Sequence, residues 1–395
     1  MRRLLLLVAV LVFVDTMLFA ALTPLLPHFA HEFALSKLRA GILVAAYPAG
    51  ALIGGLPGGA AAARLGPRRA VIVGLVGMGL ASLGFALAGG FWGLFAARLL
   101  QGLGSAFTWA GAFSWLLAAA PRDRRGQLLG SAMGAAVFGA LFGPVIGAAA
   151  ALAGRTAIFA ALAGLSVVLI AATLRLEPAP VEHPSAAAIG RALRDYRFAA
   201  GLGLMALPSL LFGILAVLGP LRLSAAGWGA VAIGAIWLTG AALETVASPL
   251  VGRLVDRRGR LLPVRVALAL GTTLALGLAA GPRPLVYAPL IVLSATAFGV
   301  LFTPAFALIA DGAENVGLPQ GMAFGFMSAA WAVGAFVGPA AGGAIAGATG
   351  DWIPFVLGAG LCAAAFALAR PASDHVGATV VVDRLPGDAA GVRGK

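Results

Sequence analysis

The chain has 395 residues, of which 61% are hydrophobic and only 10% carry a charged side chain. A soluble domain has about 25% charged residues, and a soluble fold of this length could not hide so much apolar side chain. The composition therefore excludes a soluble enzyme and, despite a formal net charge of +13, a nucleic-acid-binding protein. Cys362 is the only cysteine, which excludes a disulfide scaffold. An integral membrane protein remains, and richness in alanine, leucine and glycine favours helices over a barrel.

Twelve apolar stretches are long enough to cross a bilayer, which takes about 20 helical residues. They cover, approximately, residues 4–27, 40–63, 70–89, 91–119, 127–152, 155–174, 198–221, 226–250, 262–281, 285–310, 320–346 and 352–369. The first stretch could instead be a signal peptide, since Arg2 and Arg3 precede it, but Asp15 interrupts its apolar run. We therefore predict an all-α integral membrane protein with twelve transmembrane helices.

The distribution of lysine and arginine predicts that the N-terminus is cytoplasmic. With that orientation, 21 of the 27 basic residues fall in cytoplasmic segments, 5 fall outside, and Arg98 lies within a span. The segment with Asp311 and Glu314 is an exception, because it should be cytoplasmic yet has no basic residue. We expect both termini in the cytoplasm of a bacterial-type cell, with the chain in the inner membrane, a cytoplasmic linker at 176–197 and a mobile tail at 371–395.

The second half of the chain repeats the first at a nearly constant offset. At an offset of 193, Phe19 matches Phe212, Pro27 matches Pro220, Gly59 matches Gly252 and Gly66 matches Gly259; at 195, Gly143 and Pro144 match Gly338 and Pro339. The repeat predicts two pseudo-symmetric six-helix bundles, residues 1–175 and 198–370. An even number of spans in each half gives both halves the same orientation.

The loops after the second and eighth stretches carry related motifs, GAAAARLGPRR at 59–69 and GRLVDRRGR at 252–260. Six plus six helices with such loops resemble the major facilitator superfamily, and the resemblance covers almost the whole chain. In that superfamily these loops help to latch the two halves on the cytoplasmic side. The resemblance thus implies gating roles for Gly59, Arg64, Gly66, Arg68, Gly252, Asp256, Arg257, Gly259 and Arg260.

The first of these loops departs from the family pattern. Ala63 stands where the family usually has aspartate, and Pro67 where it has arginine or lysine, so a charge-based latch there would be weaker. Plain positive-inside anchoring is the alternative explanation of the loop arginines.

The fifth stretch contains GALFGPVIG at 139–147. It resembles a motif of the antiporter branch of the superfamily, carried here by Gly139, Gly143, Pro144 and Gly147. Glycines four residues apart let helices approach closely, and proline removes a backbone donor and bends a helix. General small-residue packing explains the same pattern, because 334–342 carries a second version. The motif therefore favours antiport over symport without deciding between them.

Three charged residues fall inside the predicted spans: Asp15, Arg98 and Glu244. A charge at the bilayer centre costs at least about 2.5–3.5 kcal/mol, which makes each a functional candidate. At 1.5 Å per residue, Asp15 lies about 16 Å and Arg98 about 20 Å from the inner edge of the membrane. We predict that they form a pair facing a central cavity. Glu244 either takes part in transport or neutralises the arginines of the loop that follows it.

The sequence around both residues supports this hypothesis. VDTMLFAALTPLLP at 14–27 and RLLQGLGSA at 98–106 resemble the first and fourth spans of drug–proton antiporters. The resemblance implies proton coupling for Arg98, with Gln101 in the same motif. Burial disfavours the charged form of a carboxyl group and a nearby arginine favours it, so competition between a proton and a substrate for Asp15 would couple their movements. A structural pair that only clamps two helices is the alternative.

Two further groups have competing interpretations. Trp109 lies on the helix of Arg98 and could contact a ligand or simply pack in the interior. His28, His31 and Glu32 could ligate a metal, but a solvated loop explains them more simply, so we predict no metal site.

No P-loop, catalytic triad, metal cage or cofactor motif is recognisable, so we predict a transporter and not an enzyme, with no cofactor and an ion gradient as its energy source. The leading expectation is proton-coupled efflux of small apolar or cationic compounds by alternating access. Its partners would be the substrate, protons and the lipid bilayer, and the chain would act as a monomer. The alternatives are a proton symporter for a sugar, organic acid or other metabolite, and a non-transporting membrane sensor.

Overall fold

The computed structural model describes residues 1–121, 125–178, 186–281, 283–318 and 320–369. Within these ranges, nothing is described of the side chains of residues 125–127, 129, 186–188, 249, 255, 256, 258, 320, 321 and 324. The predicted tail at 371–395 and part of the predicted linker, 179–185, lie outside the described residues.

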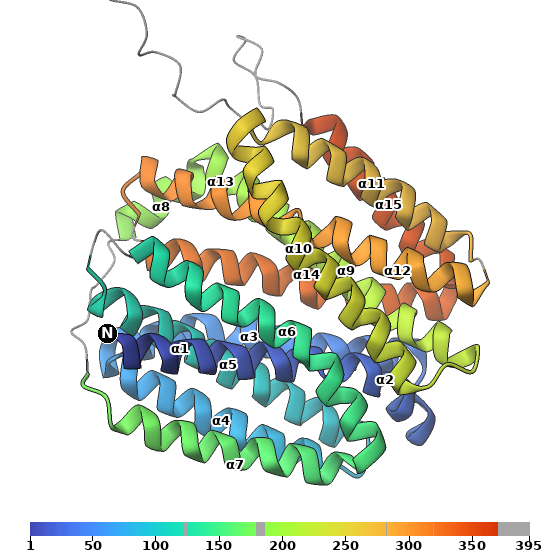
Figure 1. The fold of residues 1–395 in the computed structure, drawn as a ribbon, viewed down its shortest axis with the longest axis horizontal. Helices are drawn as coiled ribbons and strands as arrows, with labels where there is room; N and C mark the ends of the chain where they lie inside the picture. The colour runs from blue at the N-terminus through green and yellow to red at the C-terminus, as the bar shows by residue number, and fades with distance from the viewer. Residues whose placement is uncertain (122–124, 179–185, 282, 319, 370–395) are drawn as a thin grey trace, which may run out of the picture.

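The regular elements of this described part are α-helices, arranged as two stacked bundles (Figure 1). The first half contains α1 (Arg2–Ala20), α2 (Leu22–Glu32), α3 (Lys37–Leu65), α4 (Pro67–Leu87), α5 (Phe91–Ala119), α6 (Arg125–Ala153) and α7 (Arg155–Leu174). A short helix of the linker follows, α8 (Ala186–Arg194). The second half contains α9 (Tyr196–Ala225), α10 (Ala230–Arg258), α11 (Leu261–Ala279), α12 (Pro284–Gly299), α13 (Phe302–Asn315), α14 (Gln320–Thr349) and α15 (Trp352–Leu368).

Ten segments of the described chain are long and apolar enough to cross a membrane, and two of them, α1–α2 and α12–α13, are pairs of consecutive helices. Two further helices complete the predicted twelve spans. The first is α5, with 29 residues, which carries the polar Arg98 and Gln101. The second is α15, an apolar helix of 17 residues. The prediction of an all-α membrane protein with two six-helix bundles is therefore confirmed.

The two bundles repeat the same packing. In the first half α1 packs on α6, α3 on α5 and α4 on α7; in the second half α9 packs on α14, α10 on α12 and α11 on α15. Each helix of the first half thus has a counterpart one repeat later, as the sequence offset predicts.

Two spans are interrupted a few residues before a proline. The first span breaks at Ala21, and the tenth breaks between Gly299 and Phe302. In each, a proline follows closely, Pro24 and Pro304, and a proline lacks the N–H that would bond the carbonyl four residues earlier. The missing bonds fall at residues 20 and 300, next to the breaks.

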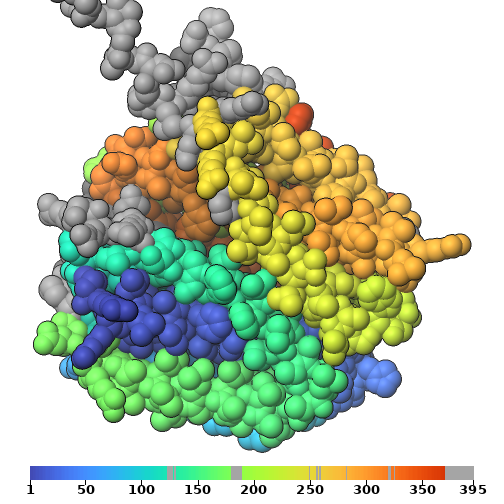
Figure 2. Space-filling model, in the orientation of Figure 1, coloured from blue at the N-terminus to red at the C-terminus, as the bar shows by residue number. Residues whose placement is uncertain are grey.

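The halves meet where α3 packs against α14 and α6 against α10. Gly41 lies against the backbone of Pro339 and Gly343, so a side chain there would collide with the α14 backbone. Similarly, Gly234 of α10 lies close to the carbonyl of Pro144. We call the end of the molecule near the N-terminus the inner end and the opposite end the outer end. Figure 2 shows α10 against the later part of α6 and diverging from it toward the inner end.

Candidate functional site

Asp15 is buried inside the first bundle, where its side chain meets two neighbouring helices. It is 1% exposed. Its Oδ2 atom lies 2.8 Å from the hydroxyl of Tyr47 on α3, 2.9 Å from the hydroxyl of Ser105 and 2.6 Å from the indole nitrogen of Trp109 on α5. Ser105 and Trp109 are four residues apart and therefore share a face of α5. Three donors thus converge on one carboxylate oxygen.

The other oxygen of Asp15, Oδ1, is buried and has no hydrogen-bond partner among the residues that the structure describes. A buried polar atom without a partner loses its hydration and gains nothing in return, which costs about 1–3 kcal/mol. Native structures contain few such atoms, and functional groups are a frequent reason for them. The carboxyl group therefore has one oxygen fixed by hydrogen-bond donors and one buried oxygen without a partner among the described residues.

Arg98 is held against the end of α1. Its guanidinium donates to the backbone carbonyls of Leu18 and Phe19, each at 3.2 Å, and to the side-chain oxygen of Gln101 at 2.6 Å. These carbonyls belong to the last turn of α1, just before the break at Ala21. The last carbonyls of a helix lack intrahelical donors, and the negative end of the helix dipole favours a cation there. Arg98 therefore stabilises the interruption of the first span.

The expected pair of Asp15 and Arg98 is indirect. No ion pair within 4.0 Å joins them among the described residues. Tyr47 lies between them: its ring is 5.0 Å from the guanidinium carbon of Arg98, while its hydroxyl contacts Asp15. The hydroxyl is also 2.7 Å from that of Ser105, and with one proton it donates to only one of these two acceptors at a time.

The site reaches the second half through aromatic rings. Phe19, whose ring lies 5.0 Å from Tyr47, also meets Trp331 of α14 edge-on at 5.2 Å. Trp109 continues the aromatic lining toward Phe113, with ring centroids 5.3 Å apart. A rearrangement of the two halves would therefore reach Asp15 through the rings of Phe19 and Tyr47.

The structure brings together all four residues predicted for this site, Asp15, Arg98, Gln101 and Trp109. Sequence reasoning missed Tyr47 and Ser105. Ser105 lies seven residues after Arg98, a spacing that puts both on one face of a helix. Tyr47 gave a weaker signal, although it is one of only three tyrosines in the chain.

The glycine motif of α6 packs against the first span at its break. Side chains at Gly139, Gly143 and Gly147 would collide with the backbone of α1 and with Ala21. Its counterpart in α14 forms a similar contact with α9, where Gly334 and Gly338 lie against backbone carbonyls. Because both halves use the stripe for close packing, its geometry does not distinguish antiport from symport. The two prolines also behave alike, since the carbonyl of Pro144 faces Gly234 and that of Pro339 faces Gly41, each in the other half.

The residues of the predicted gating loops make contacts within their own halves or with the start of the linker. Gly66 and Gly259 occupy equivalent turns with φ of 90° and 76°, a conformation that favours glycine. Arg68 donates to the carbonyl of Leu176 at 3.2 Å. Arg260 pairs with Asp311 at 2.5 Å, which supplies the missing positive charge near that acidic segment.

The remaining gating residues show no contact across the two halves within the described part. Arg64 and Arg257 are exposed, Gly59 has open space around it, and Gly252 lies near Thr303 of its own half. The side chain of Asp256 lies outside the described residues. A cytoplasmic latch therefore stays a prediction.

Glu244 lies at the centre of α10, fourteen residues from either end. It is only eight residues before Gly252, but the helix continues to Arg258, so this short distance does not place Glu244 near the inner end. It takes part in no ion pair found among the described residues.

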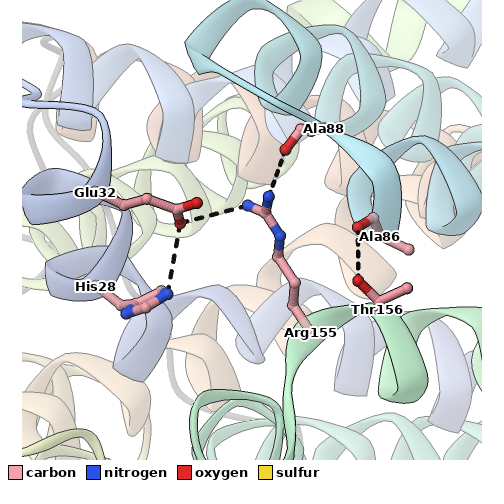
Figure 3. A network of polar contacts seen from close by, with 6 residues as sticks. All are labelled: His28, Glu32, Ala86, Ala88, Arg155 and Thr156. Atoms are coloured by element: carbon pink, nitrogen blue, oxygen red, sulfur yellow. Dashed lines mark hydrogen bonds and ion pairs between the residues drawn. The ribbon is translucent and has the colours of Figure 1, made fainter.

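The group at the outer end of the first span forms an ion network (Figure 3). Glu32 lies 3.5 Å from both His28 and Arg155, and Arg155 also donates to the carbonyl of Ala88. Beside it, Thr156 donates to Ala86 at 3.2 Å. The network joins α2 to α7 and to the end of α4. Among the described residues, no group of three acidic, histidine or cysteine side chains could hold a metal ion.

Comparisons with known proteins agree with this architecture. Residues 8–321 match the family model of the Major Facilitator Superfamily. A crystal structure of a bacterial homologue of the human lysosomal transporter Spinster, inward-facing and unoccupied, is similar in fold with a TM-score of 0.73 and 14% identity, covering 93% of this chain and 96% of that one. A D-xylose–proton symporter has a TM-score of 0.70 and 15% identity, covering 92% and 97%. No curated protein matches the sequence. The family match spans most of the chain and the fold is shared along almost its whole length, so the chain belongs to the Major Facilitator Superfamily of membrane transporters.

Proposed function

We propose that this transporter exports small apolar or cationic compounds in exchange for protons, with Asp15 as the group for which proton and substrate compete. The observation that carries the proposal is the asymmetric environment of the Asp15 carboxyl group. Oδ2 is held by three donors, and Oδ1 has no partner within the described part of the chain. We further propose that it acts as a monomer in the inner membrane, with both termini in the cytoplasm.

The free oxygen suits both partners of the exchange. A proton on Oδ1 would neutralise the carboxyl group without disturbing the three donors on Oδ2. A cationic substrate would contact the same oxygen in the ionised form. Arg98 leaves this oxygen available, because its hydrogen bonds go to α1 carbonyls and Gln101.

Aromatic rings around Asp15 support the choice of substrate class. Phe19, Tyr47 and Trp109 surround the carboxyl group or its partners, and Trp331 approaches from the other half. Aromatic faces attract organic cations and pack well against apolar groups. One acid inside an aromatic surrounding thus fits an amphiphilic cation or an apolar compound.

The donors of the site argue against a sugar or another polyhydroxylated metabolite. Such a substrate needs several polar partners, yet Tyr47, Ser105 and Gln101 are already engaged with Asp15 or Arg98. Proton symport of a polar metabolite would require these contacts to break, which makes it the weaker alternative. A sensor without transport would leave the unpartnered oxygen of Asp15 unexplained.

The experiment is substrate flux in reconstituted vesicles under an imposed pH gradient, with a panel of cationic dyes and a panel of sugars and organic acids. We expect the wild type to move dyes in the direction opposite to the protons. We expect Asp15→Asn to lose this flux while the amount of protein in the vesicles stays unchanged. The matched control is Ser209→Ala, a buried polar residue of α9 whose hydroxyl group donates to the carbonyl of Met205 in the same helix. Coupled transport of metabolites instead of dyes would establish the symport alternative, and absence of flux with both panels would contradict the proposal.

A further inference from the structure

Glu244 is an embedded carboxyl group that the transport site near Asp15 does not use. It lies fourteen residues from either end of α10, which places it about 21 Å from both along the helix axis. A charged side chain at such a depth is expensive and marks a functional site by default. The contact of Glu244 with the tenth span indicates a possible role.

The Glu244 carboxyl group lies directly on the backbone of the tenth span. Gly240, one turn earlier on α10, packs against Val292 and Ala295 of α12. On the same face, a side chain at Gly299 would overlap the carboxyl carbon and both oxygens of Glu244. Only a glycine at 299 leaves room for the carboxyl group in this position.

The contact coincides with the break in that span. α12 ends at Gly299 and α13 begins at Phe302. The carbonyl of Val300 cannot receive the usual helical bond from residue 304, because Pro304 has no N–H. A neutral carboxylic acid can donate a hydrogen bond to a backbone carbonyl, whereas an ionised carboxylate cannot. The carboxyl group of Glu244 lies against Gly299, the residue before Val300, so a change in its protonation would change the hydrogen-bonding groups next to the break.

No neighbouring charge among the described residues neutralises Glu244. Several described titratable groups of the helices packed around α10 have other partners: Arg265 lies over Phe366, Arg222 over Tyr287, Arg197 over Tyr196, Asp311 pairs with Arg260, and Glu32 with Arg155 and His28. Glu314 of α13, His31 of α2, and Arg253 and Arg257 of α10 itself are exposed. A proton needs only one oxygen atom, whereas a metal ion needs several ligands. The described residues contain no group of acids, histidines or cysteines that could provide them.

We propose that Glu244 is a second proton-binding site, and that its protonation sets the geometry of the break in the tenth span. Each half then carries one embedded acid beside an interrupted helix, Asp15 six residues before the break at Ala21 and Glu244 against the break after Gly299. The two acids do not occupy equivalent positions in the repeat, so the halves bind their protons differently. Proton binding at Glu244 does not depend on the proposed function; only its use in transport does.

The test is infrared difference spectroscopy of the full chain in lipid nanodiscs during a pH titration, which detects the carbonyl stretch of a protonated carboxyl group. We expect a titrating band that is lost in Glu244→Gln and retained in Asp15→Asn. Because the measurement needs no substrate, it separates this proposal from the proposed function. An unchanged spectrum in Glu244→Gln would overturn the assignment.

A second variant tests the contact with the break. Gly299→Ala places a methyl group where the carboxyl group lies, so we expect the midpoint of the Glu244 band to move. Gly203→Ala is the matched control, a glycine of α9 with open space around it, and it leaves the midpoint unchanged. If every carboxyl band of Gly299→Ala titrates as in the wild type, the break and Glu244 are not linked. If Glu244→Gln does not fold, Glu244→Asp replaces it, and a band that neither shifts nor changes in Glu244→Asp would overturn the assignment.

Discussion

The hydroxyl group of Tyr47 lies 2.8 Å from the Oδ2 atom of Asp15 and connects α3 to α1 at the centre of the first bundle. The ring of the same tyrosine packs under the guanidinium of Arg98. Tyr47 therefore separates the acid from the cation and contacts both. In this arrangement the carboxyl group can change its proton or its ligand without breaking an ion pair.

Tyr47→Phe removes the hydroxyl group and keeps the ring under Arg98. The loss of one hydrogen bond to a charged acceptor is worth about 1.5–3 kcal/mol, so we expect coupled flux to fall by about tenfold or more at unchanged abundance. Vesicle flux under a pH gradient measures this. Tyr196→Phe, at the exposed start of α9, serves as the control. Flux at the wild-type level in Tyr47→Phe would show that the hydroxyl group does not tune Asp15.

Arg98→Ala leaves the carbonyls of Leu18 and Phe19 without their donor at the break of the first span. We expect a loss of about 3 kcal/mol in stability, measured by thermal unfolding in detergent. Arg98→Lys keeps the charge but not the forked geometry that serves both carbonyls, so its loss is smaller. Arg253→Ala, at an exposed site, changes stability little. Equal stability of Arg98→Ala and the wild type would exclude the clamping role.

Lys37 and Asp351 form the one ion pair found among the described residues that joins the two halves, and it lies at the outer end. Both side chains are partly exposed, 39% and 24%, so solvent limits the pair to about 1 kcal/mol or less. Lys37→Asp turns attraction into repulsion, and we expect a shift of up to about fivefold toward molecules with a separated outer end.

Spin labels on the exposed His31 and Ala226, one in each half, report this separation as a distance distribution. The double variant with Lys37→Asp and Asp351→Lys should restore the wild-type distribution, because it reverses both charges. A double variant that remains shifted would show that the ion pair does not hold the outer end closed.

The spans followed from the sequence because hydropathy and helix length are local properties. The span at 91–119 was predicted with the bounds that α5 has, although this helix carries Arg98 and Gln101 and is not among the ten segments selected by apolarity alone. The breaks at Ala21 and after Gly299 also had a local cause, the missing N–H groups of Pro24 and Pro304, which sequence reasoning did not use.

The sequence predicts the candidate site only in part, because the geometry of the site depends on how the helices are rotated against one another. Asp15 and Arg98 stand out, since charges in a membrane are rare. Tyr47 does not, because a hydroxyl group in an apolar span is common. Its position between the two charged groups depends on the close approach of α3 to α5, where Gly102 lies against the backbone of Tyr47. Such contacts between distant segments leave no periodic signal in one sequence.

The most direct test of the account is proton release by the purified protein when a cationic substrate is added in weakly buffered solution. If proton and substrate compete for the free oxygen of Asp15, the wild type releases protons in proportion to the substrate bound, and Asp15→Asn releases none from this site. Substrate-driven release of the same size in Asp15→Asn would contradict the competition and remove Asp15 from the coupling mechanism.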